Sequence, residues 1–391
     1  MNNGILDNDL YKFTMQQAVH ALYPWAEAEY VFINRGGTKF KAGFAAELQQ
    51  AVNMLAFDRL FPSELAYLAE ACPFLTPVYL DFLKSYRFNP LECYITQQDG
   101  DLSVFIHGPW YRTILWEVPL MAMISELYFK LSEDAPDPRD VRRATNVIKA
   151  EQFKEHGVKF ADFGTRRRYS SENHDALIGD LLSVEGHTLV GTSNVWLAQK
   201  YGVKPIGTHA HEWFMYHGAT HGYRAATRAA LYAWMRVYHG SLGIALTDTY
   251  TTPAFFADFD AVAARLFDGV RHDSGDPFLF ADSVVEHYSE LGIDPTTKTI
   301  VFSDGLSVDK ALALQLHCAG KIRASFGIGT SLTNDVGITA PLNMVIKMSR
   351  CRSHPDNSWV PAVKLSDNEG KHTGDAEEIA FCLRTIERSL A

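Results

Sequence analysis

The chain has 391 residues, of which 47% are hydrophobic and 21% charged. These are the proportions of a globular protein with a sizeable core, and the length favours roughly two or three domains. The formal net charge of −10 argues against a general nucleic-acid-binding or membrane-surface protein, so positive charge for an anionic substrate must be concentrated locally.

The first 115 residues predict an α+β domain. Helical periodicity occurs at 9–22, 43–56 and 63–84, and a strand-like run occurs at 28–34. Residues 92–108 alternate around Asp99 and Gly100, a pair typical of a two-residue hairpin turn. Near the end of the chain, PLNMVIKM and WVPAVKLSD (359–367) are two further strand-like runs. We expect residues 350–391 to return to this domain.

The pattern between residues 116 and 349 changes to repeated strand–loop–helix units. The expected strands are 158–162, 188–191, 204–207, 243–247, 269–272, 298–303 and 323–327. Helical patterns separate most of them, for instance at 222–239, 277–290 and 307–319. Such alternation predicts right-handed crossovers and a parallel sheet. Seven units without a dinucleotide fingerprint favour a closed or nearly closed α/β barrel.

Each expected strand ends in a cluster of polar or glycine residues. The clusters are DFGTRRR (162–168), GTSN (191–194), GTHAHEW (207–213), TDT (247–249), RHDSGDP (271–277), SDG (303–305) and SFGIGT (325–330). In an α/β barrel the loops after the strands open onto one face, where catalysis takes place. The clusters therefore predict one convergent site for a charged substrate.

The SFGIGT cluster suits a phosphate group. Gly327 and Gly329 would let backbone N–H groups approach an anion, and Thr330 and Ser331 add hydroxyl donors. The alternative is a tight turn that needs positive φ.

The RHDSGDP and SDG clusters suit a sugar or a metal–diphosphate. Arg271 can pair with an oxyanion, while Asp273 and Asp304 can bind ribose hydroxyls or Mg²⁺. The alternative is a helix start in which Asp273 or Ser274 is the N-cap.

The GTHAHEW cluster has three interpretations. His209 and His211 form an H-x-H pair of the kind that holds zinc in some barrel hydrolases, but catalytic zinc needs about three ligands and only His272 lies at another exit. One imidazole could instead be a nucleophile toward a phosphoryl group. Each histidine considered alone is more often structural.

The DFGTRRR cluster places Phe163 close to Arg166. An aromatic face beside a cation can hold a flat heteroaromatic acid. The alternative is that the ring is core and the arginines form a solvated face.

The remaining sequence features point to a reducing compartment. The five cysteines are scattered without a C-x-x-C pair, and neither a leader pattern nor an apolar run of about 18 residues occurs. We expect a cytoplasmic protein without disulfides or membrane spans.

Together these residues resemble the nicotinate phosphoribosyltransferase family, in its bacterial form. AHEWF, RHDSGDP, SFGIGT and PLNMVIKM occur in the family's order, and the resemblance runs from DLYKF to AVKLSD. It implies a type II phosphoribosyltransferase: an irregular, TIM-like seven-stranded α/β barrel with an α+β N-terminal domain. It also implies a homodimer whose active sites combine residues of both subunits.

The resemblance assigns roles residue by residue. His211 matches the histidine that ATP phosphorylates. Tyr11, from the partner subunit, and Phe163 match the rings that stack on the pyridine. Thr208 and Arg271 match positions that hold nicotinate. Gly327, Gly329 and Thr330 match the loop around the 5′-phosphate of phosphoribosyl pyrophosphate, and Asp273 and Asp304 match ribose or Mg²⁺ positions.

The implied reaction is attack of the pyridine nitrogen on C1 of the phosphoribosyl group, with diphosphate leaving and ATP hydrolysis coupled to it. Nicotinamide-using relatives look to have an aspartate where this chain has Ser193, which favours the acid as substrate. Ser331 stands where some relatives have a basic residue. The open alternatives are a nicotinamide-specific enzyme, a zinc hydrolase using His209 and His211, and a non-catalytic binder of a phosphorylated metabolite.

Overall fold

A computed structural model describes residues 2–132, 134–338 and 340–390. Contacts divide the chain into two compact units. The first comprises Met1–Gln17, Glu29–Gly207 and Ile328–Lys347, and the second comprises Ala18–Ala28, Thr208–Gly327 and Met348–Ala391. Both units mix helices with strands, so the fold is of the mixed α/β kind.

The first unit contains an antiparallel sheet. It is built from β1 (Glu27–Asn34, all but its first two residues), β3 (Asp101–Pro109) and β2 (Cys93–Gln98), in that order. Strands β2 and β3 pair in register from Cys93↔Ile106 to Gln98↔Asp101. Asp99 (φ 50°) and Gly100 (φ 81°) both have positive φ, as a type I′ turn requires. The predicted hairpin is therefore confirmed.

The helices of the first unit follow most of the predicted patterns. They are α1 (Leu10–Leu22, shared with the second unit), α2 (Phe44–Leu55), α3 (Pro62–Ala71), α4 (Pro77–Ser85), α5 (Trp110–Thr113), α6 (Glu117–Leu131), α7 (Arg139–Glu155), α8 (Ser171–Leu182), α9 (Val195–Tyr201) and α16 (Thr330–Thr333). The single helical stretch expected at 63–84 is wrong. Pro73 disfavours helical backbone at Cys72, and Thr76 caps a new helix by accepting a hydrogen bond from the Tyr79 N–H.

Two parallel strands also belong to the first unit. They are β4 (Phe160–Asp162) and β5 (Leu189–Thr192), paired from Phe160↔Leu189 to Asp162↔Thr192. The strand expected at 204–207 is not formed, because there is only an isolated bridge between Thr192 and Pro205. Proline has no N–H to donate, so it cannot continue a ladder.

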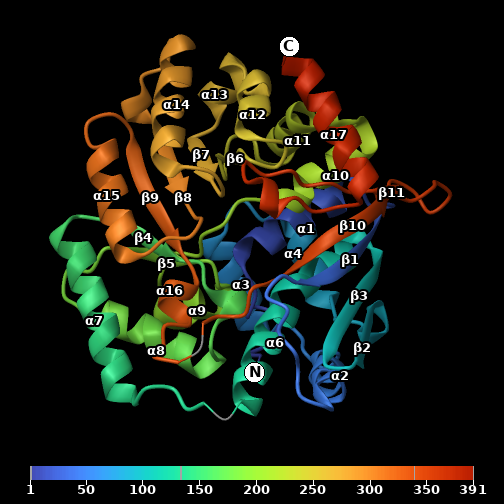
Figure 1. Ribbon diagram of the computed structural model, residues 1–391, viewed down its shortest axis with the longest axis vertical. Helices are drawn as coiled ribbons and strands as arrows, with labels where there is room; N and C mark the ends of the chain where they lie inside the picture. The colour runs from blue at the N-terminus through green and yellow to red at the C-terminus, as the bar shows by residue number, and fades with distance from the viewer. Residues whose placement is uncertain (1, 133, 339, 391) are drawn as a thin grey trace. The chain divides into compact units, whose positions relative to one another are not determined.

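The second unit contains four parallel strands in the order β9–β8–β7–β6 (Figure 1). Their bounds are β6 (Ile244–Leu246), β7 (Gly269–His272), β8 (Thr299–Phe302) and β9 (Arg323–Ile328, whose last residue belongs to the first unit). The four corresponding predictions are confirmed. The register aligns Leu246 with Arg271 and Arg271 with Val301, so the residues after β6, β7 and β8 emerge at one edge.

The helices of the second unit lie before, between and after these strands in the sequence. They are α10 (His211–His221), α11 (Tyr223–Tyr238), α12 (Thr252–Asp258), α13 (Ala261–Leu266), α14 (Pro277–Glu290), α15 (Val308–Cys318) and α17 (Ala376–Leu390). The helical patterns expected at 222–239, 277–290 and 307–319 are confirmed. Helix α17 packs against α11 and α12 (Figure 1).

The second of the two predicted C-terminal strands is shorter than expected. Strand β10 (Met344–Arg352) is formed, but the run expected at 359–367 yields only β11 (Val360–Pro361), which pairs with β10, and an isolated bridge between Lys364 and Thr373. The proline inside the run has no N–H, and this ends the pairing.

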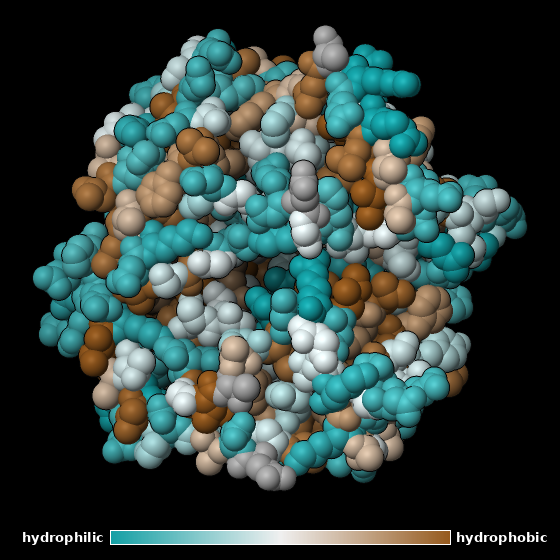
Figure 2. Space-filling model, viewed as in Figure 1, coloured by the Kyte–Doolittle hydropathy of each residue, from teal (hydrophilic) through white to brown (hydrophobic). Residues whose placement is uncertain are grey.

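The surface carries large apolar side chains only in places. On the face shown in Figure 2, hydrophobic residues lie as separate patches among hydrophilic ones. The five cysteines are buried and form no disulfide. Across residues 2–132, 134–338 and 340–390, every helix is too short or too polar to cross a bilayer.

Candidate functional site

Three strand-exit residues converge in the second unit. His211 is the first residue of α10, Asp248 follows β6 by two residues, and Asp273 comes directly after β7. One potential ligand atom from each lies within 4.8 Å of the others. Asp273 and His211 were predicted individually, whereas Asp248 was noted only as part of the TDT cluster.

Hydrogen bonds define the protonation state of His211. Its Nε2 lies 2.9 Å from Asp273 Oδ2, and its Nδ1 lies 3.0 Å from Thr249 Oγ1. A carboxylate only accepts hydrogen bonds, so Nε2 carries the hydrogen and Nδ1 accepts from the Thr249 hydroxyl. Nδ1 is therefore the nitrogen with an available lone pair.

The electrostatics keep this histidine neutral. Burial and the charge of Lys364 lower the pKa of His211 from 6.5 to about 4, against the opposing effect of Asp248 and Asp273. Burial raises the pKa of Asp273, but Arg271 and the hydrogen bond from His211 bring it well below its usual range. The site thus pairs a neutral imidazole with an ionised carboxylate.

This arrangement predicts an unusual pH dependence. A histidine with pKa 6.5 would lose its lone pair to a proton below that pH, whereas the lowered pKa of about 4 keeps His211 neutral in mildly acidic solution. We expect the ring of His211 to stay unprotonated between pH ~7.5 and ~5.5, which an NMR titration of the ring would show. A titration centred near pH 6.5 would contradict the lowered pKa.

Arg271 and Asp273 form one network with Ser303. Arg271 Nη2 lies 2.8 Å from Asp273 Oδ1, and its Nε donates to Ser303 Oγ at 2.8 Å. The Ser303 hydroxyl in turn donates to Asp273 Oδ1 at 2.7 Å. The guanidinium therefore holds the carboxylate that orients His211.

The N-cap of α14 is Asp276, which accepts from the Phe278 and Leu279 N–H groups. Asp273 and Ser274 are therefore not the cap, and the helix-start alternative for them is wrong. Ser274 Oγ instead donates to Asp248 Oδ2 at 2.6 Å.

Three further predicted residues lie in the second unit apart from this network. Asp304 is paired with Lys371 Nζ at 2.8 Å, so a cation already neutralises it. Thr208 Oγ1 donates to the Ile244 carbonyl at 3.1 Å, and Gly327 lies within β9.

His209 lies in a different environment from His211. Its Nε2 accepts from the Leu246 N–H at 3.2 Å, and its ring packs edge-on against Trp234 at 4.7 Å. Burial lowers its pKa to about 3. Because Nε2 accepts from a fixed backbone N–H, Nδ1 carries the ring hydrogen and neither nitrogen offers a lone pair, so the geometry does not support a zinc site shared by His209 and His211.

Sequence reasoning missed a buried lysine. Lys364 Nζ lies 3.5 Å from Asp248 Oδ2, and the side chain is 7% exposed. Its segment is held to the exit of β6, because the Leu365 N–H donates to the Thr249 carbonyl and the Ser366 N–H to the Asp248 carbonyl. A lysine in an otherwise apolar AVKLS run was the available signal.

The carboxylates of the site differ in how well they could bind Mg²⁺, which prefers oxygen ligands. Asp248 Oδ1 is buried and has no hydrogen-bond partner among the described residues, whereas both oxygens of Asp273 are engaged. One orphaned carboxylate oxygen fits a Mg²⁺ ion held chiefly by a phosphorylated substrate rather than by a protein cage.

The other predicted residues lie in the first unit. Ser193 Oγ donates to Asp9 Oδ1 at 2.7 Å, Arg166 Nη1 lies 3.2 Å from Glu117 Oε1, and the Phe163 N–H donates to the Ile328 carbonyl. Tyr11, on α1, is 8% exposed.

The SFGIGT loop ends in the first unit. Gly329 precedes α16, which begins at Thr330, and has φ −100° and ψ −113°. The positive φ of the tight-turn alternative is therefore wrong for Gly329. A Cβ at this residue would meet only the Phe163 carbonyl, at 3.5 Å, so space is open beside it.

Comparisons with known proteins agree with one class of enzyme. A model of the nicotinate phosphoribosyltransferase family matches residues 158–386, and a model of that family's N-terminal domain matches 6–125. The nicotinate phosphoribosyltransferase of Desulforapulum autotrophicum is 57% identical, over 100% of this chain and 100% of the relative. That of Chromohalobacter salexigens is 50% identical, over 99% of this chain and 98% of the relative.

A crystal structure of nicotinate phosphoribosyltransferase from Porphyromonas gingivalis matches with a TM-score of 0.97 and 43% identity, over 99% of this chain and 100% of that one. These features define a phosphoribosyl-transferring enzyme. The chain belongs to the nicotinate phosphoribosyltransferase family. Its substrates are nicotinate and phosphoribosyl pyrophosphate, and its reaction belongs to NAD salvage.

Proposed function

We propose that this enzyme couples phosphoribosyl transfer to ATP hydrolysis through a phosphohistidine at His211. The observation that carries the proposal is the orientation of the imidazole, in which Asp273 holds Nε2–H and leaves Nδ1 unprotonated. A buried carboxylate that orients an imidazole and stabilises its positive charge is a recurring device in catalysis.

In the first half of the cycle, the γ-phosphoryl group of ATP moves to His211. The lone pair of His211 Nδ1 attacks the γ-phosphorus of ATP, the bond to the bridging oxygen breaks, and ADP leaves with the electron pair. The imidazole becomes cationic, and the ionised Asp273 stabilises that charge through Nε2–H. Water later cleaves the P–N bond, returns neutral His211 and releases phosphate.

The transfer step needs no protein nucleophile. The pyridine nitrogen of nicotinate forms a bond to C1 of the phosphoribosyl group while the bond from C1 to diphosphate breaks. Orientation and stabilisation of the leaving diphosphate supply the catalysis. Mg²⁺, when bound, would supply positive charge to the diphosphate. The Oδ1 of Asp248 is the carboxylate oxygen left to hold it, and Asp273 and Asp304 are the further candidates that the sequence indicates.

We propose the substrate contacts that the sequence predicts. Tyr11 of a partner subunit and Phe163 would stack on the pyridine, while Thr208, Arg271 and Ser193 would select the carboxylate of nicotinate. The 5′-phosphate would lie against Gly327, Gly329 and Thr330. Arg166 would add positive charge beside Phe163, although its ion pair with Glu117 neutralises part of that charge.

We further propose the larger organisation that the sequence indicates. Residues 1–115, with 350–391 returning to them, would form one domain and 116–349 an irregular TIM-like barrel. The end of the N-terminal family match at residue 125 supports the first of these boundaries. The enzyme would act as a homodimer with shared sites. Five buried, reduced cysteines support a cytoplasmic setting.

Diphosphate release tests the proposal. With phosphoribosyl pyrophosphate and Mg²⁺, we expect release with nicotinate, a higher rate when ATP is added, and at least about tenfold less with nicotinamide. Quinolinate serves as the second comparison acid. Equal rates with and without ATP would contradict the coupling, and a preference for nicotinamide would contradict the proposed carboxylate contacts.

A further inference from the structure

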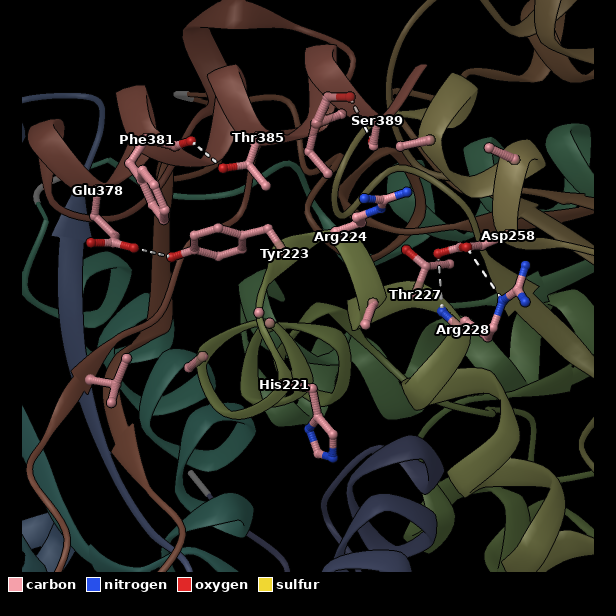
Figure 3. A pocket seen from close by; sticks show the side chains of 18 residues that line it. His221, Tyr223, Arg224, Thr227, Arg228, Asp258, Glu378, Phe381, Thr385 and Ser389 are labelled. Carbon is pink, nitrogen blue, oxygen red and sulfur yellow. Dashed lines mark hydrogen bonds and ion pairs between the residues drawn. The ribbon is translucent and has the colours of Figure 1, made fainter. Parts of the chain in front are cut away.

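A second cavity lies in the second unit, away from the strand exits. Its volume is about 780 Å³, within the range of about 300–1,000 Å³ typical of small-molecule sites. It is bounded by the end of α10, the start of α11, α12 and α17 (Figure 3). His221 at this cavity and His211 are the two ends of α10, which are about 15 Å apart at 1.5 Å per residue.

One wall of the cavity is aromatic. The rings of Tyr223 and Phe381 lie 6.1 Å apart in an edge-on arrangement, and Phe381 is 52% exposed. The Tyr223 hydroxyl donates to Glu378 Oε1 at 2.6 Å, which fixes the tyrosine (Figure 3). An exposed ring beside a fixed ring offers a flat surface for another planar group.

Among the charged side chains that line the cavity, one arginine has no partner in the described part of the chain. Arg228 is paired with Asp258, whose Oδ1 lies 3.5 Å from its Nε, and Glu378 accepts from Tyr223. Arg224 lies between these groups in Figure 3, and its guanidinium has no hydrogen bond or ion pair with any described residue. A cation without a partner inside a cavity favours an anionic ligand.

The cavity wall also includes the hydroxyl of Thr227. Thr227 lines the cavity and is 5% exposed, and its Oγ1 has no hydrogen-bond partner in the described part of the chain. A helical threonine ordinarily donates to the carbonyl four residues earlier. In addition, α11 begins at Tyr223 and its N-cap Gly222 has no side chain, so the positive end of the helix is open toward the same space.

We propose that this cavity is an effector site for a small aromatic anion with the chemistry of a nucleoside monophosphate. The planar ring lies on Phe381, and the anionic group is bound by Arg224 and the Thr227 hydroxyl. Tyr223 connects the cavity to the reacting histidine: its ring packs on Tyr250 at 5.6 Å, and Tyr250 directly follows Thr249, which donates to His211 Nδ1. This second role rests on the proposed function of His211, whereas the binding itself does not.

Equilibrium dialysis with AMP and UMP tests the binding, with phosphoribosyl pyrophosphate and Mg²⁺ but no nicotinate present to fill the transfer site, since phosphoribosyl pyrophosphate has no planar ring. Arg224→Gln and Phe381→Ala should each weaken binding about tenfold or more. Arg384→Gln is the matched control, because Arg384 is exposed on α17 outside the cavity, and it should bind as the unmodified enzyme does. Circular dichroism checks that each variant is folded.

Several outcomes would overturn the proposal. These are equal binding by Arg224→Gln and Arg384→Gln, equal binding of AMP, adenosine and inorganic phosphate, or self-association through this face with no nucleotide bound. Occupancy should also change the rate of ATP-stimulated diphosphate release at least about twofold, in the unmodified enzyme but not in Arg224→Gln. Binding with an unchanged rate would contradict the effector role while leaving the phosphohistidine untouched.

Discussion

Replacing His211 with asparagine is expected to abolish the stimulation by ATP. The asparagine amide takes the place of the Nδ1 side of the ring and cannot accept a phosphoryl group, while Arg271 and Ser303 still hold Asp273, so only the direct transfer remains. The ratio of diphosphate release with ATP to release without it should fall to about one. The slow ATP-independent transfer should persist, since no step of it uses the imidazole.

His354→Ala is the matched control for this prediction, because His354 is an exposed histidine of the same unit. It should keep the full stimulation. Undiminished stimulation in His211→Asn would show that ATP acts through another group. Loss of both ATP-dependent and ATP-independent transfer would show instead that the asparagine disturbs the substrate site.

The largest effect on stability is expected from Arg168→Met. Arg168 and Asp7 form a two-point ion pair at 2.8 and 2.9 Å, with both side chains at most 1% exposed. Burial raises the pKa of Asp7, but Arg168 and the Asn194 amide lower it to about 2. Without the guanidinium the carboxylate is buried alone, which costs about 3–5 kcal/mol.

Urea unfolding measures this loss, with Arg143→Met as the control, since Arg143 is 64% exposed and lies 3.9 Å from its acidic partner. The control should change the free energy of unfolding by less than about 0.5 kcal/mol. The double variant Asp7→Leu with Arg168→Met should recover part of the loss. A loss below about 1 kcal/mol in Arg168→Met would contradict the account of a charge left uncompensated.

Local chemistry explains which elements could be predicted from the sequence. Asp99 and Gly100 tolerate positive φ, so the hairpin follows from two residues. The strands near Arg271 and Phe302 are short apolar runs with a polar exit, and they are found where expected. Pro205 and Pro361 lie within runs of the same kind but have no N–H to donate. The first run forms only an isolated bridge, and the second forms only a two-residue strand.

The site was less predictable because its contacts join distant segments. His211 and Asp273 were identified through motifs, and they do meet. Ser303, which contacts both Asp273 and Arg271, comes from another strand exit. The lysine beside Asp248 comes from the C-terminal run. Only the folded chain shows that Lys364, 116 positions after Asp248, is its neighbour.

The central claim is that His211 carries the phosphoryl group. The most direct test is to incubate the enzyme with γ-labelled ATP and Mg²⁺, digest it, and locate the label by mass spectrometry under alkaline conditions, which preserve phosphohistidine. We predict acid-labile label on the peptide that contains His211, discharged when nicotinate and phosphoribosyl pyrophosphate are added. Label on any other residue, or no label before nicotinate and phosphoribosyl pyrophosphate are added, would contradict the mechanism.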